Sequence, residues 1–452
     1  MLGQGIGRGD RVAYFGANHP DLLTTLFAAS RIGAITVLLN ARLSPAEISF
    51  LLEDSGASLL IHGSDTADVV ARVNPQLHEN VTTVEVSSQA FDQLFSNEPV
   101  PHIAVGLEDP CLLMYTSGTT GQPKGAVLTH GNILFNDINV LIETDLTSHE
   151  VCLAVAPLFH IAGLNGLVLP VILKGGTVEI LSSFMPRVVL DVIRERKVTC
   201  MFGVPAMLDA LSTEETFNAT TLASLKTVIV GGAPVPQRIL RRWAEHHVDV
   251  QQGYGLTETS PAVLKLSADD AGQHIGSAGK PQFFVDVRLA DPSGSDSDDV
   301  EVGEILTRGP NVFSEYWNRP EATTGAFRDG WFRTGDIASV NDQGFYTLKD
   351  RSKDMYISGG ENIYPAEIES VLLDLPGITE AAVVGIADDK WGEVGRAFLV
   401  TEPETAWTED SVLEALQGRL ARYKQPKSVI FVDELPRTST GKLRKNVLRE
   451  YA

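Results

Sequence analysis

Residues 11–61 read RVAYFGANHPDLLTTLFAASRIGAITVLLNARLSPAEISFLLEDSGASLLI. Short apolar or β-branched runs, typical of buried strands, stand at 11–15, 35–39 and 58–61. The two segments between them carry apolar residues at helical spacing. Ser44, Pro45 and Glu47 add an N-cap, a first-turn proline and the acid of a capping box. This alternation predicts parallel strands covered by helices, an α/β fold.

The same alternation returns further along the chain. Strand-like runs stand at 198–202, 227–230 and 248–251, and two of them lead into glycine-rich segments at 231–234 and 253–255. In open α/β sheets, ligands bind beyond the carboxyl ends of the strands. We therefore expect these glycine loops to meet at one crevice. The alternative is that the glycines only mark turns between secondary-structure elements.

Two later segments differ in pattern. Residues 286–307 carry a polar stretch, 291–299, between β-like runs, which indicates a small, mostly antiparallel subdomain with an exposed hairpin tip. From Asp350 the pattern changes to a compact α+β unit. The sequence thus predicts a large N-terminal domain of layered α/β subdomains plus the antiparallel subdomain, followed by a smaller α+β domain.

Composition excludes several classes of protein. The chain has 452 residues, 43% hydrophobic and 21% charged, with a formal net charge of -22. Such an acidic chain should repel nucleic acids and anionic membranes. Its three cysteines show no metal-binding spacing, and no apolar run spans a bilayer. We interpret the chain as a cytoplasmic enzyme. Peripheral membrane contact and the oligomeric state stay open.

One loop carries the strongest chemical signal: Thr116–Gly125, TSGTTGQPKG. Glycines let the backbone approach a ligand closely, successive backbone N–H groups form an anion-binding concavity, and Lys124 adds a positive charge. We interpret the loop as a cradle for nucleotide phosphates. It lacks the P-loop pattern, and in isolation an ordinary surface turn would explain it.

Other segments carry matching chemistry. In GYGLTET, at 253–259, Tyr254 could stack on a base and Glu258 could bind Mg²⁺ beside phosphates. Asp336 ends WFRTGD, where a carboxylate could bind ribose hydroxyls, and Lys442 ends the loop PRTSTGK. Taken singly, each has a plain structural explanation as a surface acid, a turn-stabilising residue or a solvent loop.

Together and in this order, these motifs, with KDRSKDMYISGGENIYP at 349–365, resemble the adenylate-forming superfamily. That superfamily comprises acyl-CoA synthetases, carrier-protein-loading adenylation domains and firefly-type luciferases. The resemblance runs from about Gly9 to the C-terminus and is greatest to bacterial fatty-acyl-CoA synthetases. It implies that the chain is short at its N-terminus relative to the family.

The resemblance implies binding sites for ATP, Mg²⁺ and coenzyme A. The residues that would bind ATP or AMP are Thr116, Ser117, Gly118, Thr119, Thr120, Gly121, Lys124, Gly232, Ala233, Pro234, Gln252, Gly253, Tyr254, Gly255, Thr257, Asp336, Arg351 and Lys442. Those that would bind CoA are Gly359, Gly360, Trp391 and Lys445. Thr116 and Glu258 would hold the metal. Lys353 would be the hinge between an N-terminal domain, 1–352, and a mobile C-terminal domain, 353–452.

The resemblance also implies the reaction. The catalytic residues would be Lys442, Thr257, Glu258, Thr116 and His160. They would activate a carboxylic acid, a medium- or long-chain fatty acid or an aryl acid, to an acyl-adenylate. Pyrophosphate would leave in this step. CoA would then form the thioester, and AMP would leave. The alternatives are a stand-alone enzyme that loads an acyl carrier protein, a luciferase-like oxygenase, and an inactive ligand sensor. No sizeable insertion stands near 279–308 or before Asp350, which favours CoA.

Overall fold

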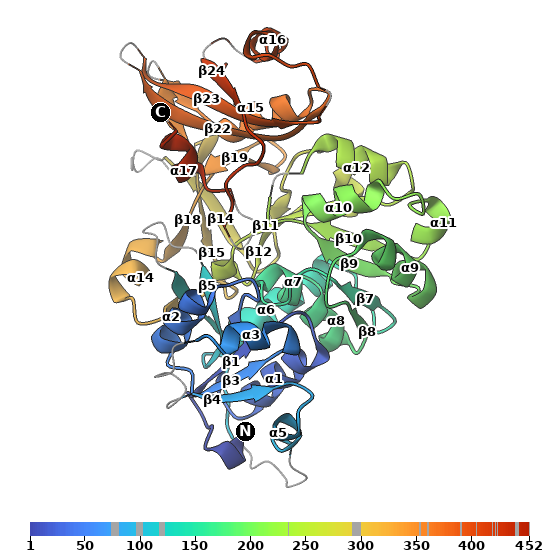
Figure 1. Ribbon diagram of the computed structural model, residues 1–452, viewed down its shortest axis with the longest axis vertical. Helices are drawn as coiled ribbons and strands as arrows, with labels where there is room; N and C mark the ends of the chain where they lie inside the picture. Colours follow the sequence, from blue (N-terminus) through green and yellow to red (C-terminus); the bar gives the residue numbers. More distant parts are fainter. Residues whose placement is uncertain are drawn as a thin grey trace. The chain divides into compact units, whose positions relative to one another are not determined.

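The computed structural model describes residues 1–73, 81–95, 103–116, 123–233, 235–291, 300–351, 354–358, 361–388, 391–403, 405–417, 419–420, 422, 424–438 and 443–451 (Figure 1). The chain forms two compact units. The first comprises Met1–Val287 and Thr307–Phe332, and the second comprises Arg288–Leu306 and Arg333–Ala452.

The first unit contains two seven-stranded sheets of similar design. The first sheet has the order β16-β6-β5-β2-β1-β3-β4. Its strands β1 to β5 are parallel, whereas β6 and β16 run antiparallel to their neighbours. The bounds are β1 Arg11–Phe15, β2 Ile35–Leu39, β3 Leu59–His62, β4 Thr82–Glu85, β5 Pro110–Thr116, β6 Lys124–Thr129 and β16 Glu315–Tyr316.

The second sheet has the order β13-β12-β11-β10-β9-β7-β8. Strands β7 to β11 are parallel, and β12 and β13 complete the sheet in antiparallel fashion. The bounds are β7 Val151–Ala154, β8 Thr177–Ile180, β9 Cys200–Gly203, β10 Thr227–Val230, β11 Val250–Gly255, β12 Ala262–Lys265 and β13 Lys280–Pro281. The predicted α/β class is confirmed.

Helix α2 of the first unit begins where the sequence predicts. In α2 the Ser44 side chain accepts from Glu47 N while the Glu47 carboxylate accepts from Ser44 N, which is the expected capping box. The helices are α1 Pro20–Arg31, α2 Pro45–Ser55, α3 Ala67–Val70, α5 Gln89–Asp92, α6 His130–Thr144, α7 Ile161–Asn165, α8 Val168–Lys174, α9 Pro186–Arg196, α10 Pro205–Ser212, α11 Ala219–Leu222, α12 Gln237–Ala244, α13 Ala268–Ala271 and α14 Pro320–Ala326.

One large apolar core joins the two sheets. It contains side chains of β1, β5 and β6 from the first sheet, of β7, β9 and β10 from the second, and of helices α6 to α10. A smaller cluster packs α2 and α3 on the opposite face of the first sheet. Burial of apolar area from both sheets in one cluster makes them a single packing unit.

One sequence expectation was wrong. Residues 253–255, expected as a glycine loop, continue β11, and Gly253 pairs with Lys265 of β12. The pairing shifts register between Tyr254 and Gly255, and a side chain at Gly255 would collide with the carbonyl of Pro261. The glycine is therefore there for close backbone approach at a bulge rather than for a turn.

The second unit contains most of two further sheets. One has the order β14-β15-β18-β17 with β19 beside β18, and its described β17–β18 and β18–β19 pairs are antiparallel as expected. The other has the order β21-β20-β23-β22, with β24 parallel to β23. Its strands are β14 Asp286–Ala290, β15 Val302–Arg308, β17 Phe327–Arg328, β18 Trp331–Val340, β19 Tyr346–Arg351, β20 Tyr356–Ser358, β21 Glu361–Ile363, β22 Ile378–Asp388, β23 Gly392–Thr401 and β24 Ser428–Phe431.

Helices α15 Pro365–Leu373, α16 Glu409–Ala415 and α17 Lys445–Arg449 pack on the sheet of β20 to β24. Residues 288–306 and 333–351 belong to this compact unit, whereas the sequence predicts the division after residue 352. The hinge Lys353 and most of the hairpin tip lie outside the described residues, so both stay predictions.

Candidate nucleotide-binding site

The first unit brings together two residues predicted to bind the metal. Thr116 is the last residue of β5, and Glu258 lies in a 3-10 turn, Thr257–Thr259, that follows β11. Although they are 142 residues apart in the chain, Thr116 Oγ1 donates to Glu258 Oε1 at 3.4 Å. Lys124 stands opposite Thr116 at the start of β6, so the phosphate-loop motif connects two paired strands.

A residue that sequence reasoning missed completes this cluster. Tyr316, on β16, donates from its hydroxyl to Glu258 Oε1 at 2.8 Å, and its ring faces Lys124 Nζ at 5.5 Å from the centroid. Glu258 is 7% exposed, and among the described residues no hydrogen bond reaches its second oxygen, Oε2. Burial and the Glu258 charge raise the pKa of Tyr316, so its hydroxyl keeps its proton.

Four buried asparagines hold the backbone around this turn. Asn165 donates to Ser260 O, and Asn136 donates to Asn165 O while accepting from Ala262 N. Asn311 donates to the carbonyls of Thr259 and Ala262. On α6, Asn132 donates to the carbonyls of Pro310 and Val312. Asparagines at 132, 136 and 139 among the apolar residues of α6 were the available sequence signal.

Asp54, at the end of α2, contacts both strand β5, which ends at Thr116, and residues 317–319, which follow Tyr316. Tyr115, which precedes Thr116, donates its hydroxyl to Asp54 Oδ2 at 2.7 Å. Trp317 Nε1 donates to Asp54 O at 3.2 Å, and Arg319 forms an ion pair with the Asp54 carboxylate. These contacts restrain both segments on either side of the Thr116–Glu258 pair.

The residues expected near adenine lie at the ends of neighbouring strands β10 and β11. Gly232 has a φ of +83°, the left-handed region that glycine tolerates, and Ala233 is exposed. Tyr254 and Gln252 are 9% and 8% exposed. The buried Nε2 of Gln252 has no hydrogen-bond partner among the described residues, which fits a donor that a ligand would satisfy.

His160 precedes α7, and its exposed ring stacks at a tilt on Phe159, with 4.7 Å between centroids. Although His160 is partly exposed, desolvation by the protein atoms around it and the charge of Arg42 lower its pKa to about 4, so the imidazole is neutral at pH 7. Asn18 holds the preceding segment, because it accepts from Leu158 N and donates to Ala156 O. The ring is therefore uncharged, and the backbone that leads to it is held in place.

In the second unit, the two residues predicted to bind ribose are cross-strand partners. Asp336 on β18 stands opposite Arg351 on β19, and Asp336 is 7% exposed. Next to it, Glu304 accepts from Gly335 N at 3.1 Å and pairs with Arg333. The backbone thus places the two predicted ribose ligands side by side.

The predicted CoA residues in this unit have contrasting surroundings. The indole-bearing residue Trp391 is 43% exposed. Lys445 is largely buried, with Nζ 2.7 Å from Glu369 Oε1. Burial lowers the pKa of Lys445, but the carboxylates of Glu369, Asp350 and Asp354 outweigh it and leave the pKa raised. Burial also raises the pKa of Glu369, against the opposing effect of Lys445.

The C-terminal segment 419–449 is basic, with nine Lys and Arg residues, and several of these form ion pairs. Besides Lys445, three described cations of this segment pair with acids: Lys424 with Glu367, Arg437 with Glu380, and Arg449 with Asp354. Arg419, Arg422, Lys427 and Arg444 are exposed. The segment is therefore less cationic at its surface than its composition indicates.

Several predicted site residues lie outside the described part of the chain, or have side chains outside it. The former are Ser117, Gly118, Thr119, Thr120, Gly121, Pro234, Lys353, Gly359, Gly360 and Lys442, and the latter is Arg351. Among the described residues, no group of three or more His, Cys, Asp or Glu side chains could hold a metal ion. In the same part of the chain, no helix has the length and apolar character needed to cross a membrane.

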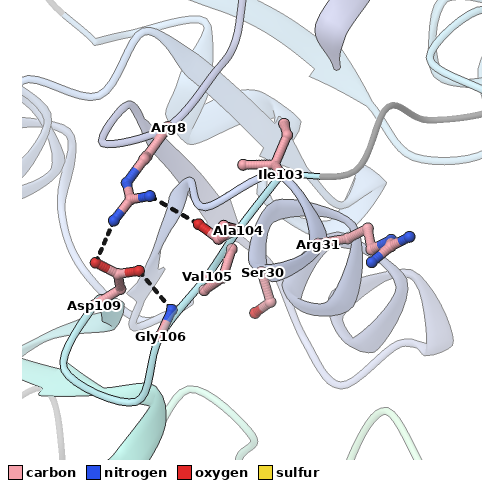
Figure 2. A pocket seen from close by; sticks show the side chains of 8 residues that line it. All are labelled: Arg8, Ser30, Arg31, Ile103, Ala104, Val105, Gly106 and Asp109. Carbon is pink, nitrogen blue, oxygen red and sulfur yellow. Dashed lines mark hydrogen bonds and ion pairs between the residues drawn. The ribbon is translucent and has the colours of Figure 1, made fainter.

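A hollow of about 640 Å³ lies elsewhere on the first unit (Figure 2). Arg8 spans it, donating to Asp109 Oδ1 at 2.6 Å and to Ala104 O at 2.7 Å. Its lining residues precede β1, β2 and β5, so it lies at the amino ends of parallel strands. The predicted site lies at their carboxyl ends, where ligands of such sheets bind, and the hollow is therefore not that site.

Comparison with known families identifies the class. The AMP-binding enzyme family matches residues 1–317, and the family of AMP-binding enzyme C-terminal domains matches residues 367–442. The chain therefore belongs to the AMP-binding enzymes, and the resemblance to the adenylate-forming superfamily is confirmed.

The individual relatives indicate which AMP-binding enzymes the chain is similar to. The chain is 49% identical over 445 residues to a feruloyl-CoA synthase from Amycolatopsis, covering 98% of this chain and 89% of that protein. It is 38% identical over 449 residues to a long-chain-fatty-acid–CoA ligase of Mycobacterium tuberculosis, covering 99% and 89%. The O-succinylbenzoate coenzyme A synthetase of Bacillus subtilis, solved with ATP and magnesium, has a TM-score of 0.86 at 34% identity, covering 100% of this chain and 90% of that one.

AMP-forming CoA ligases use ATP, Mg²⁺ and CoA, in agreement with the co-substrates predicted from the motifs. These relatives are CoA ligases, and they lend no support to the carrier-protein alternative.

Proposed function

We propose that this protein is an AMP-forming acid–CoA ligase. A carboxylate oxygen of the substrate attacks the α-phosphorus of ATP, and the bond to pyrophosphate breaks. The CoA thiolate then attacks the carbonyl carbon of the acyl-adenylate, and the bond to AMP breaks. The observation that carries the proposal is the cluster of Thr116, Glu258, Tyr316 and Lys124 around the phosphate-loop strands.

The first step must overcome charge repulsion, because a carboxylate approaches a polyanion. Lys124 beside the phosphate loop would offset part of that repulsion, and Lys442 would do so at the reacting carboxylate. Mg²⁺, when bound, would neutralise phosphate charge. Glu258 and Thr116 suit it, since they offer a carboxylate and a hydroxyl oxygen, the hard ligands that Mg²⁺ takes alongside phosphates and water.

We propose separate sets of residues for the adenine and the ribose of the nucleoside. Tyr254, Gln252, Gly232 and Ala233 would frame adenine, with the unsatisfied Gln252 amide as a donor. Asp336 and Arg351 would bind ribose as neighbours across β18 and β19. Thr257 would lie at the α-phosphate, adjacent to Glu258.

The second step requires Lys442 to withdraw before the thiol enters. We propose that the C-terminal domain pivots at Lys353, so that one site serves both half-reactions. Gly359 and Gly360 would flank the pantetheine path, and exposed Trp391 would contact CoA. Lys445, already paired with Glu369, would support that surface from beneath.

For the acid, we propose an aryl-propenoic acid of the ferulate type, with a medium- or long-chain fatty acid as second candidate. Identity is 49% to the feruloyl-CoA synthase and 38% to the fatty-acid ligase. The neutral imidazole of His160 is compatible with an uncharged acyl group.

The test is an assay of the full chain with ATP, Mg²⁺, CoA and single acids, namely ferulate, 4-coumarate, benzoate and straight-chain acids from short to long. AMP and acyl-CoA should form without any protein acceptor, and most rapidly with a cinnamate-type acid. Faster turnover of fatty acids would overturn the substrate assignment alone. Absence of pyrophosphate release with every acid would contradict the ligase proposal.

A further inference from the structure

The carboxylate of Glu258 is held by one of its two oxygens. Both Tyr316 and Thr116 donate to Oε1, at 2.8 Å and 3.4 Å, and among the described residues none donates to Oε2. Two donors on one oxygen restrict rotation of the carboxylate and leave the other oxygen pointing in a defined direction. We propose that Tyr316 is a positioning residue that aims Glu258 at the divalent cation accompanying ATP. This inference rests on the proposed function.

Tyr316 is itself firmly placed. Its backbone pairs with Ala126 of β6, and its N–H donates to Thr323 Oγ1 at 2.9 Å. Its ring packs edge-on against Phe313, with 4.8 Å between centroids. A donor fixed in this way can orient its acceptor without losing much conformational entropy at the moment of binding.

The segment 313–316 holds Glu258 at two levels. Phe313 N donates to the backbone carbonyl of Glu258 at 2.8 Å, while the Tyr316 hydroxyl holds the side chain. The backbone contact fixes where the turn lies, and the hydroxyl fixes how the carboxylate is rotated. Removal of the hydroxyl alone should therefore affect rotation and leave the turn in place.

The ring and the hydroxyl of Tyr316 serve different partners. The ring faces the ammonium of Lys124, and this cation–π contact needs no hydroxyl. Tyr316→Phe keeps the ring on Phe313 and beneath Lys124 while deleting only the bond to Glu258. This substitution isolates the proposed role.

A purely structural role makes a different prediction. If the hydroxyl only satisfied a buried carboxylate, its loss would lower stability and leave cation affinity unchanged. If it positions the carboxylate, cation affinity falls, because outer-shell partners of metal ligands typically contribute 10- to 100-fold in affinity.

The experiment measures Mn²⁺ binding to the full chain by electron paramagnetic resonance, with a saturating ATP analogue whose α,β-bridge is a methylene group. Tyr316→Phe should weaken Mn²⁺ binding by about tenfold or more. Tyr14→Phe is the matched control, since the buried Tyr14 hydroxyl has no partner among the described residues and lies on β1. Wild-type affinity in Tyr316→Phe would overturn the proposal.

A double substitution separates this inference from the proposed function. Glu258→Gln should weaken Mn²⁺ binding, and adding Tyr316→Phe should weaken it no further if the hydroxyl acts through Glu258. Unchanged binding in Glu258→Gln would refute the metal assignment itself. Weaker binding in Glu258→Gln but not in Tyr316→Phe would refute only the positioning role.

Folding of the Tyr316→Phe variant is checked by circular dichroism. Should it fail to fold, 3-fluorotyrosine at position 316 retains the ring and the hydroxyl but makes the phenol a stronger donor. The expected result is a changed Mn²⁺ affinity, and an unchanged affinity would overturn the proposal.

Discussion

Lys445 on α17 and Glu369 on α15 form an ion pair of 2.7 Å in which the side chains are 11% and 16% exposed. Glu369 Oε1 also accepts from Val383 N on β22, at 2.7 Å. The pair thus connects the last helix of the chain to another helix and to the sheet. Removal of one partner leaves a charge without compensation in a place that water barely reaches.

We therefore expect Lys445→Met to lower the free energy of unfolding of the second unit by about 3 kcal/mol. Arg437→Gln, which breaks an exposed pair with Glu380, should cost less than about 1 kcal/mol. Denaturant titration monitored by the second unit's hydrogen exchange measures both. Equal losses of unfolding free energy in the two variants would contradict the claim that burial makes the Lys445–Glu369 pair costlier to break than an exposed pair.

Asp137 on α6 is 5% exposed, and its Oδ1 has no hydrogen-bond partner among the described residues. Burial raises its pKa well above the ordinary value of 3.8. Above pH 3.8 the unfolded chain loses this proton while the folded chain retains it, so this group makes stability fall as pH rises towards the folded pKa.

Asp137→Asn should abolish that loss and make the protein more stable than wild type at pH 8, by roughly 1 kcal/mol or more. Near pH 4 the free energies of unfolding of the variant and the wild type should be closer to each other. Urea midpoints from pH 4 to pH 8 measure the difference, and a destabilised variant at pH 8 would show that the carboxylate is charged and paired.

His160 should titrate far below an ordinary histidine. The folded pKa is about 4 against an ordinary 6.5, so the unfolded chain binds this proton first and the group's contribution makes stability fall as pH drops from 6.5 to 4. Nuclear magnetic resonance titration of the ring, assigned by loss of its signal in His160→Phe, measures the pKa. A midpoint near 6.5 would mean that water solvates the ring fully.

Asn136 is fully buried and bonds both Asn165 O and Ala262 N. Asn136→Ala should cost about 2 kcal/mol of stability, since it leaves a buried N–H and a carbonyl without partners. It should also slow pyrophosphate exchange by loosening the Glu258 turn. Asn446→Ala, at an exposed position on α17, is the control and should change neither.

Lys442 stays a prediction from the motif PRTSTGK. Lys442→Ala should slow acyl-adenylate formation by roughly a hundredfold or more, the scale for loss of one oriented stabilising group. Thioester formation from preformed acyl-adenylate should change far less. Rapid-quench assays of the separate half-reactions measure both, and equal losses would argue against a pivoting domain.

The sequence predicted most elements of the described fold correctly because their signals are local. The capping box at Ser44 and the apolar run of β1 depend on neighbours within a few residues. The end of β11 was misjudged, since a glycine signals a turn and a close approach equally well. Only the carbonyl of Pro261, brought near by folding, decides between them.

The order of the motifs by itself determined the family, and with it ATP, Mg²⁺ and CoA as co-substrates. Tertiary structure alone decided that Tyr316 meets Glu258 and that Lys445 meets Glu369. These contacts depend on which strands and helices become neighbours, and hydrogen bonds and ion pairs of side chains leave no periodic trace in the chain. A tyrosine or a lysine in the sequence has the same letters whether it faces solvent or holds a buried carboxylate.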